Sequence, residues 1–177
     1  MKKLMVILAA VVMAGAAHAA TMTWSVLNMQ AQGVEAGWMV ALYDASSTFD
    51  YASAKDGSLQ ALYTSAAYAT GTTIRGGSTG NNKPDGTAFA AGDSISAYAV
   101  IFNAETIADA TQVMISGVKS ATVGASGGNI TLAFGSMALT TTANTFLNSS
   151  WQAVPEPTSG LLMLVGLGAL ALRRRRA

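Results

Sequence analysis

The feature that most limits how this chain can fold is the order of its last 24 residues, 154–177. A short polar motif, Val154-Pro155-Glu156-Pro157, precedes an uncharged apolar run at 158–172 and a terminal cluster of four arginines at 173–176. Each proline fixes its own φ and disfavours helix in the residue before it. The motif could therefore serve simply as a rigid linker between the body and the apolar run, a reading that is compatible with any further role of the tail.

The apolar run has the properties of a short membrane anchor. As a helix it would span roughly 22 Å at about 1.5 Å per residue, which is less than the hydrocarbon layer of roughly 30 Å. Arginine side chains compensate, because their stems stay in the apolar region while the guanidinium groups reach the headgroups. Arginine-rich flanks stay on the cytoplasmic side, so the body is expected on the other side. The sequence thus predicts a transmembrane helix at 158–172, followed by a basic stop formed by Arg173, Arg174, Arg175 and Arg176.

Taken together, these three parts resemble a PEP-CTERM sorting domain, and the resemblance covers residues 154–177. In that family the tail is the substrate of exosortase, a membrane transpeptidase-like enzyme of Gram-negative bacteria that also make exopolysaccharide. The resemblance implies that Pro155, Glu156 and Pro157 are recognised as substrate. It also implies transient anchoring in the inner membrane before the protein reaches the cell surface or a biofilm matrix. Similar tails occur at the C-termini of some ice-binding proteins, which leaves ice binding as a remote alternative.

The first 19 residues have the pattern of a signal peptide. A positively charged start, Met1-Lys2-Lys3, precedes an apolar segment at 4–16, and Ala17 and Ala19 supply small residues on either side of His18. This pattern predicts cleavage by signal peptidase before Ala20. An uncleaved anchor is the alternative, but the apolar segment is short. Export of the body agrees with the orientation predicted for the tail.

The charge of the body at 20–153 differs from that of the whole chain, whose formal charge is +1. Six of the ten Lys and Arg residues lie in the two ends, which leaves four in the body against eight acidic residues and a net charge near −4. Nucleic-acid binding requires a clustered basic face that neutralises phosphates. We therefore exclude nucleic acid as a partner.

The body also lacks the side chains on which most catalytic sites depend. The sequence has no cysteine, and its only histidine, His18, lies in the signal peptide. Imidazole acid/base catalysis, thiol nucleophiles, common zinc sites and disulfides are therefore excluded. Two facing carboxylates could catalyse glycoside hydrolysis, but the acidic residues of the body are scattered along the sequence and have no flanking motif. We expect no enzyme, no catalytic residue, no cofactor and no metal.

Alternating apolar residues predict several strands in the body. The clearest are at 21–26, 38–44 and 94–102, and the last of these has apolar residues on both faces, as in a central strand covered on both sides. Shorter candidates lie at 112–118, 130–134 and 146–154. Helical spacing of Leu59, Leu62 and Ala66, after a possible cap at Ser58, predicts one short helix within 50–67. The fold class we expect is mainly β: a small β-sandwich-like antiparallel domain with one short helix, between the N-terminal signal helix and the C-terminal transmembrane helix.

Residues 68–92 are rich in glycine, asparagine and proline and are expected to form loops. Asp85 and Asp93 could supply oxygen ligands to calcium, although no EF-hand spacing is present. Aromatic residues could stack on sugars, although alternating aromatics in strands more often form the core. The candidates are Trp24, Trp38, Tyr43, Tyr51, Tyr63 and Tyr68.

These observations favour an exported structural protein of the cell surface or extracellular matrix, with exopolysaccharide as a candidate partner and signal peptidase and exosortase as processing enzymes. The alternative is a carbohydrate- or calcium-binding adhesive module that uses the loop at 71–93. The expected division is a signal peptide at 1–19, a β-rich body at 20–153 and a sorting tail at 154–177.

Overall fold

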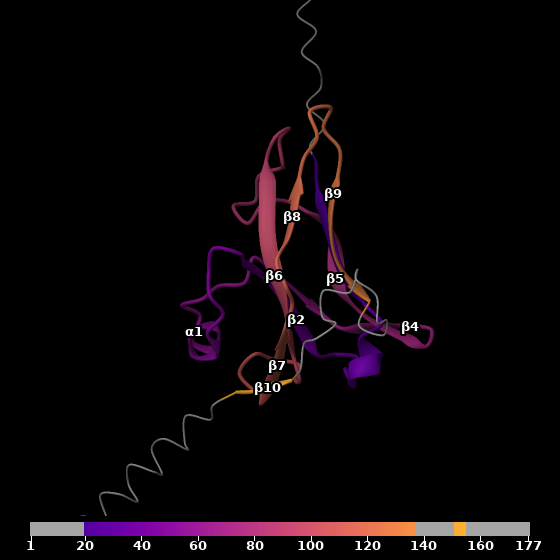
Figure 1. The fold of residues 1–177 in the computed structure, drawn as a ribbon, viewed down its shortest axis with the longest axis vertical. Coiled ribbons are helices and arrows are strands. Elements are labelled where there is room, and N and C mark those ends of the chain that lie inside the picture. Colours follow the sequence, from indigo (N-terminus) through magenta and orange to yellow (C-terminus); the bar gives the residue numbers. More distant parts are fainter. Residues whose placement is uncertain (1–19, 137–150, 155–177) are drawn as a thin grey trace, which may run out of the picture.

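The computed structural model describes residues 20–136 and 151–154, in which the regular structure is almost entirely β (Figure 1). The strands are β1 (Met22–Leu27), β2 (Met39–Asp44), β3 (Tyr63–Ala66), β4 (Tyr68–Thr70), β5 (Thr73–Asn81), β6 (Ser94–Phe102), β7 (Gln112–Ile115), β8 (Lys119–Thr122), β9 (Ile130–Ser136) and β10 (Gln152–Ala153). The α-helix α1 (Tyr51–Asp56) and the 3-10 turn η1 (Met29–Gln32) complete the elements. The prediction of a mainly β protein with one short α-helix is confirmed for this part of the chain.

The strands form two sheets that pack face to face. One has the order β4-β5-β1-β9, and the other has the order β10-β7-β6-β2-β3. Strand β8 pairs with the first half of β6, whereas β7 pairs with its second half. In Figure 1, β5 and β9 lie in one layer, β6 and β2 lie in the other, and α1 lies on the far side of the β6 layer.

One pairing departs from the predicted antiparallel arrangement. Strands β1 and β9 run parallel, with Met22 opposite Ile130 and Trp24 opposite Leu132. The chain crosses from one sheet to the other between β8 and β9. It enters β9 beside the start of β1, where the Ile130 N–H donates to the Thr21 carbonyl at 3.0 Å. All the other strand pairs are antiparallel, as expected.

Strand β6 is buried on both faces, which confirms the prediction of a central strand. We call the apolar side chains between the two sheets the inner core; β6 contributes Ile95, Ala97, Ala99 and Ile101 to it. On its other face, Tyr98, Val100 and Phe102 belong to a second group, the outer cluster. The outer cluster is covered by the segment that contains α1, by the loop before β7, and by Val154 at the end of β10. Each face of one strand therefore has its own core.

Strand β5 lies in a stretch that glycine content predicted to be loop. Gly76 stands where the two sheets approach closely, so that a Cβ there would lie 2.8 Å from Val40 Cγ2. At Gly77, φ is +136°, and a Cβ would lie 2.1 Å from the Trp24 carbonyl oxygen. The glycines are thus strand residues that permit close packing, and the loop prediction is wrong for β4 at 68–70 as well as for 73–81.

The helix within 50–67 lies earlier in the sequence than predicted. Helix α1 begins after Asp50, whose carboxylate accepts a hydrogen bond from the Ser53 N–H at 2.8 Å, and Gly57 ends it with φ at +83°. The proposed cap at Ser58 is wrong, because the residues at 63–66 form β3 and pair with β2. Pairing with the sheet overrides the helical spacing of the apolar residues.

Predictions for the two ends of the chain mostly concern residues outside the described ranges. These are the signal helix at 1–19, the transmembrane helix at 158–172, the sorting residues Pro155, Glu156 and Pro157, and the arginines at 173–176. Within residues 20–136 and 151–154, no helix has the length and apolar character needed to cross a bilayer.

Candidate functional site

The described part of the body ends in a short strand that fastens residues 151–154 to the sheet. Strand β10 pairs antiparallel with β7, and the Val154 N–H donates to the Thr111 carbonyl at 2.8 Å. The Val154 side chain is only 8 % exposed and belongs to the outer cluster. The predicted sorting residues begin at the next position, Pro155. The site of interest is therefore the junction between the body and the tail.

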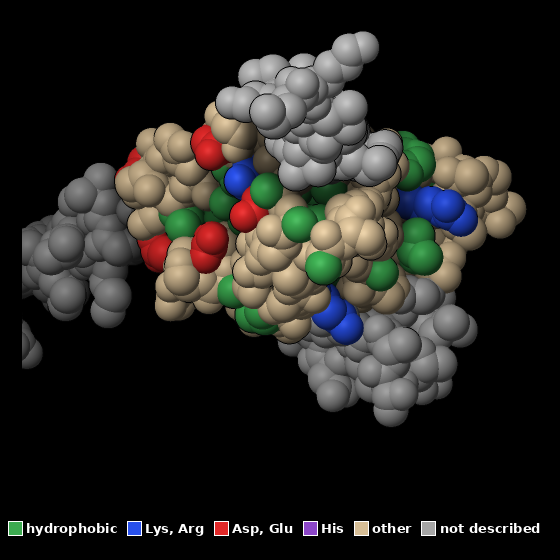
Figure 2. Space-filling view, turned by 90° about the horizontal axis from the view of Figure 1, so that it is seen from above, with side chains coloured by type: hydrophobic (Ala, Val, Ile, Leu, Met, Phe, Trp, Pro, Cys, Tyr) green, Lys and Arg blue, Asp and Glu red, His purple; other side chains and the backbone are tan. Residues whose placement is uncertain are grey.

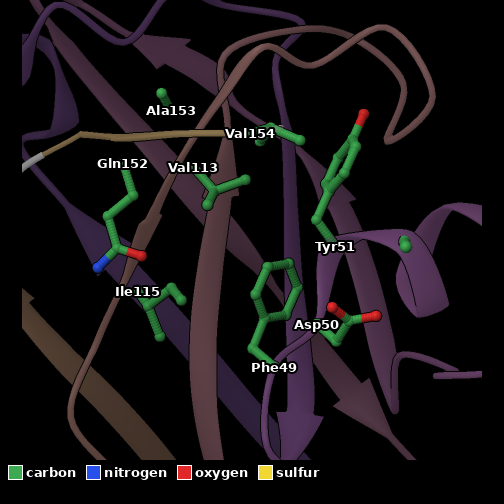
Figure 3. A pocket seen from close by; sticks show the side chains of 9 residues that line it. Phe49, Asp50, Tyr51, Val113, Ile115, Gln152, Ala153 and Val154 are labelled. Carbon is green, nitrogen blue, oxygen red and sulfur yellow. The ribbon is translucent and has the colours of Figure 1, made fainter. Parts of the chain in front are cut away.

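A pocket of about 240 Å³ opens at this junction (Figure 3). Phe49 and Tyr51 form one wall, and Val113 and Ile115 of β7 form another. Gln152, Ala153 and Val154 complete the lining. Asp50 and Ala52 also line it, but most of the lining side chains are apolar, so the pocket suits apolar contacts.

Two residues at the start of α1 give the pocket its polar edge. The hydrogen bonds from Ser53 lower the pKa of Asp50, so its carboxylate is charged at neutral pH. The Tyr51 hydroxyl donates toward the carbonyls of Ile107 at 2.7 Å and Ala110 at 2.9 Å. Burial, and then the charge of Asp109, raises the pKa of Tyr51. The Tyr51 ring is thereby held between α1 and the loop before β7.

A second cleft, of about 300 Å³, lies beside the β5–β6 connection. Its apolar lining includes Leu62, Phe89 and Ile95, and Lys83 lies at its edge. The Lys83 ammonium lies 2.8 Å from Asp93 Oδ2. Their hydrogen bond raises the pKa of Lys83 and lowers that of Asp93. The part of 71–93 that follows β5 therefore contributes Lys83, Pro84 and Phe89 to this cleft.

The two aspartates proposed for calcium each bond to neighbouring groups. Asp93 accepts from Lys83 and from the Ala90 N–H, at 2.8 and 2.7 Å. Asp85 accepts from the Thr87 N–H at 2.9 Å and from the Thr87 hydroxyl at 2.7 Å, and these bonds lower its pKa. Within the described residues, no three His, Cys, Asp or Glu side chains are grouped so that they could hold a metal ion.

The other aspartates also stabilise turns. Asp44 accepts from the Ser46 N–H and Asp56 from the Ser58 N–H, both at 2.8 Å, and these bonds lower both pKa values. Figure 2 shows acidic side chains gathered at the side of α1, with basic ones scattered singly on the face in view. No clustered basic surface is visible on that face.

The aromatic residues proposed for sugar stacking divide between the core and the surface. Trp24 and Tyr43 are fully buried, and Trp38 packs edge-on against Trp151 at a centroid distance of 5.8 Å. Tyr63 donates to the Asn82 carbonyl at 2.6 Å. Tyr68 is 47 % exposed, and among the described residues it is the aromatic side chain that stands out on the surface. The structure does not bring these rings together as a sugar-binding platform.

Ala20, the predicted first residue of the mature chain, lies within the fold. Its N–H donates to the Phe89 carbonyl at 3.2 Å and its carbonyl accepts from the Phe89 N–H at 3.1 Å. Ala20 is 1 % exposed. The other two residues of the predicted cleavage pattern, Ala17 and Ala19, are outside the described ranges. Ala20 is thus fixed to the body by its pairing with Phe89.

Sequence reasoning missed the pocket at the junction. Tyr51 was considered only as a stacking residue, and Phe49 was not considered. The available signal was the apolar Val154 directly before Pro155, since the strand predicted at 146–154 would bring that side chain onto the sheet. Of that strand, the described part confirms β10 at 152–153.

Comparison with known proteins bears on the tail. The model of the PEP-CTERM protein-sorting motif matches residues 153–176, which confirms the resemblance found in the sequence. No curated protein and no solved structure matches the chain. The chain therefore carries a PEP-CTERM sorting motif. Such a motif marks an exported protein that exosortase processes and that is anchored in a membrane during sorting.

Proposed function

We propose that this chain is a non-enzymatic structural protein of the cell surface or extracellular matrix of a Gram-negative bacterium. The observation that carries the proposal is the sorting motif at 153–176, attached directly to a small β body. Signal peptidase releases the body at Ala20, and the tail holds it in the inner membrane on the periplasmic side. Exosortase then acts near Pro155-Glu156-Pro157, and the body passes to the surface or into exopolysaccharide.

The chemistry of the body supports a structural role. Most of its aspartates are engaged in turns or, like Asp50, cap a helix, so they stabilise local structure. Exposed strand positions carry small hydroxyl residues, such as Thr64, Thr70 and Thr131. Hydroxyl groups at low charge density suit many weak hydrogen bonds to a hydrated polysaccharide matrix.

The test is the intact mass of the protein recovered from native cell envelope and from the medium. We expect a chain that begins at Ala20 and ends near Pro155-Glu156-Pro157, and any added mass identifies what it is joined to. A chain that retains Arg173–Arg176 in both fractions would make it a resident membrane-anchored protein and would contradict the proposal.

The second cleft favours one alternative, a carbohydrate-binding adhesive module. The cleft combines an apolar floor, which includes Leu62 and Ile95, with hydroxyls from Ser46, Ser94 and Ser96. Saccharides present apolar ring faces and hydroxyl edges, which such a surface matches. Lys83 also lines the cleft, and the ammonium donors that Asp93 does not use are left to bind a sugar hydroxyl or carboxylate.

Calorimetry with neutral and uronic-acid oligosaccharides tests this alternative. If the cleft binds acidic sugars, Lys83→Ala abolishes the binding heat and Lys119→Ala, on β8, leaves it unchanged. Equal heats for the two variants would place binding elsewhere, and the absence of heat with the unmodified protein would remove the alternative.

A further inference from the structure

The segment before the sorting motif is held at both of its ends. Trp151 packs against Trp38, and its indole N–H donates to the Gln32 carbonyl at 3.1 Å. At the other end, Val154 is buried in the outer cluster and its N–H donates to the Thr111 carbonyl. We call residues 151–154 the latch.

The latch lies very close to the position where processing is proposed. Only residues 155–157 separate Val154 from the apolar run that begins at Thr158. Three residues reach at most about 10 Å when fully extended. The headgroup layer on each side of a bilayer is itself about 5 to 7 Å thick. With the latch closed, the body would therefore stand against the headgroups and leave little room around the sorting motif.

An enzyme that attacks a peptide bond must bring its reacting atoms to about 3 to 3.5 Å from that bond. The closed latch obstructs this approach, since its backbone is paired with β7 and Val154 is buried. Release of residues 151–154 would lengthen the accessible chain by roughly 13 Å. Because β10 is a two-residue strand at the end of its sheet, it can open locally while the rest of the body stays folded.

We propose that the latch must detach from the body before the sorting motif is processed, so that Trp151 and Val154 act as positioning residues that set the processing rate. This inference rests on the proposed function, because it assumes that the tail is processed near Pro155-Glu156-Pro157. Exosortase acts on the open form, and the rate follows the population of that form. The body thereby controls when its own tail is removed.

A disulfide across the latch tests the proposal. Val113 and Gln152 are directly paired across β7 and β10, and the chain has no cysteine of its own. The variant Val113→Cys/Gln152→Cys can therefore form only one disulfide within the chain, at a pair spacing that suits it, and it leaves the matched motif at 153–176 unchanged. Non-reducing electrophoresis separates this monomer from chains joined to one another. In bacteria that process the unmodified chain, we expect the stapled chain to retain Arg173–Arg176 and to be processed at least about tenfold more slowly. Dithiothreitol should restore the rate.

A matched staple away from the latch is the control. Ser94 and Thr122 are paired across β6 and β8, so Ser94→Cys/Thr122→Cys constrains the body without touching the latch. We expect it to be processed at the unmodified rate. If both stapled chains are processed at the unmodified rate, the release step is wrong although the sorting function stands. If even the unmodified chain keeps its arginines, the proposed processing fails, and the latch proposal fails with it.

A substitution in the body, outside the latch, tests the same proposal by loosening the latch instead of closing it. Trp38→Leu removes the ring against which Trp151 packs and leaves residues 151–177 unchanged. A looser latch should give processing several-fold faster than that of the unmodified chain. The unfolding midpoint of the purified body, compared between Trp38→Leu and the unmodified protein, shows whether the substitution also lowers global stability. Processing that is unchanged or slower in Trp38→Leu would overturn the role of Trp151.

Discussion

The inner core and the outer cluster lie on opposite faces of one strand, β6, but they are closed in different ways. The inner core is enclosed by two sheets, and β1 and β9 contribute Trp24, Leu132 and Phe134 to it, all nearly or fully buried. The outer cluster is covered by a six-residue helix, loops and the end of a two-residue strand. Val154, which adjoins Pro155, belongs to the outer cluster, whereas Trp151 at the other end of the latch packs against the inner core.

This difference indicates that one face of β6 stays covered for as long as the body is folded, whereas the cover of the other face can open locally. Strands within sheets share hydrogen bonds with neighbours on both edges, so they unfold together, whereas loops and terminal strands open individually. We therefore expect substitutions in the inner core to affect global stability, and substitutions in the outer cluster to affect local opening. Four predictions test this contrast, from the largest expected effect to the smallest.

Phe134→Ala should have the largest effect. The side chain is fully buried in the inner core, and truncation of a buried phenylalanine costs about 3 to 5 kcal/mol. Chemical denaturation followed by tryptophan fluorescence measures this as a lower unfolding midpoint. A loss below about 1 kcal/mol would mean that the inner core does not determine global stability.

Gly76→Ala should have the next largest effect. The added Cβ would lie 2.8 Å from Val40 Cγ2, so the two sheets must separate locally, at a cost of about 1 to 3 kcal/mol. Gly124→Ala is the matched control, because nothing lies within 4 Å of its Cβ position. Equal unfolding midpoints for the two variants would contradict a close sheet contact at Gly76.

Tyr51→Phe should have a smaller and more local effect. It removes the hydroxyl that donates to the carbonyls of Ile107 and Ala110, which costs about 1 kcal/mol. We expect faster amide hydrogen exchange at Val154, with little change at Leu132. Tyr68→Phe, at an exposed position, should change neither amide. Uniform acceleration throughout the body would show that the outer cluster does not open separately.

Tyr43→Phe should have the smallest effect and the opposite sign. The Tyr43 hydroxyl is buried with no hydrogen-bond partner among the described residues, so its removal should stabilise the body slightly. Burial, and then the charge of Tyr98, raises the pKa of Tyr43 to about 12 from 10.0. Because this tyrosine ionises near pH 10 in the unfolded chain and only near 12 in the folded body, its titration leaves stability unchanged below pH 10 and lowers it as the pH rises from 10 toward 12. Denaturation between pH 9 and 12 should show a smaller alkaline loss in Tyr43→Phe than in the unmodified protein.

Local patterns predicted the strands that have one clear apolar face or two. Strands β1, β2, β6 and β9 were correctly placed: buried positions alternate along β1 and β9, whereas β2 and β6 are buried on both faces. The tail motif was also found directly from its sequence, since its recognition depends on residue order and not on packing.

The misplaced elements depend on distant contacts. The glycines of β5 are required by Val40 and Trp24, which lie far away in the sequence. The apolar residues around Leu62 have helical spacing, but the Leu62 N–H donates to the Leu42 carbonyl at 2.7 Å. The parallel pairing of β1 with β9 and the pocket beside Val154 likewise arise only when separate segments meet. None of these contacts has a local signature.

The described chain enters and leaves the body at opposite ends of the sandwich, with the start of β1 at the top of Figure 1 and β10 at the bottom. The nine residues of β6 alone span about 30 Å along this axis. While an uncleaved signal segment and the apolar tail both remain in one membrane, they would pull the two ends of the body toward the same plane. Folding would then work against that tether, and removal of the first 19 residues would relieve it. Under the proposed processing, signal cleavage would therefore act as a timing step, after which the body would stand on its single remaining anchor.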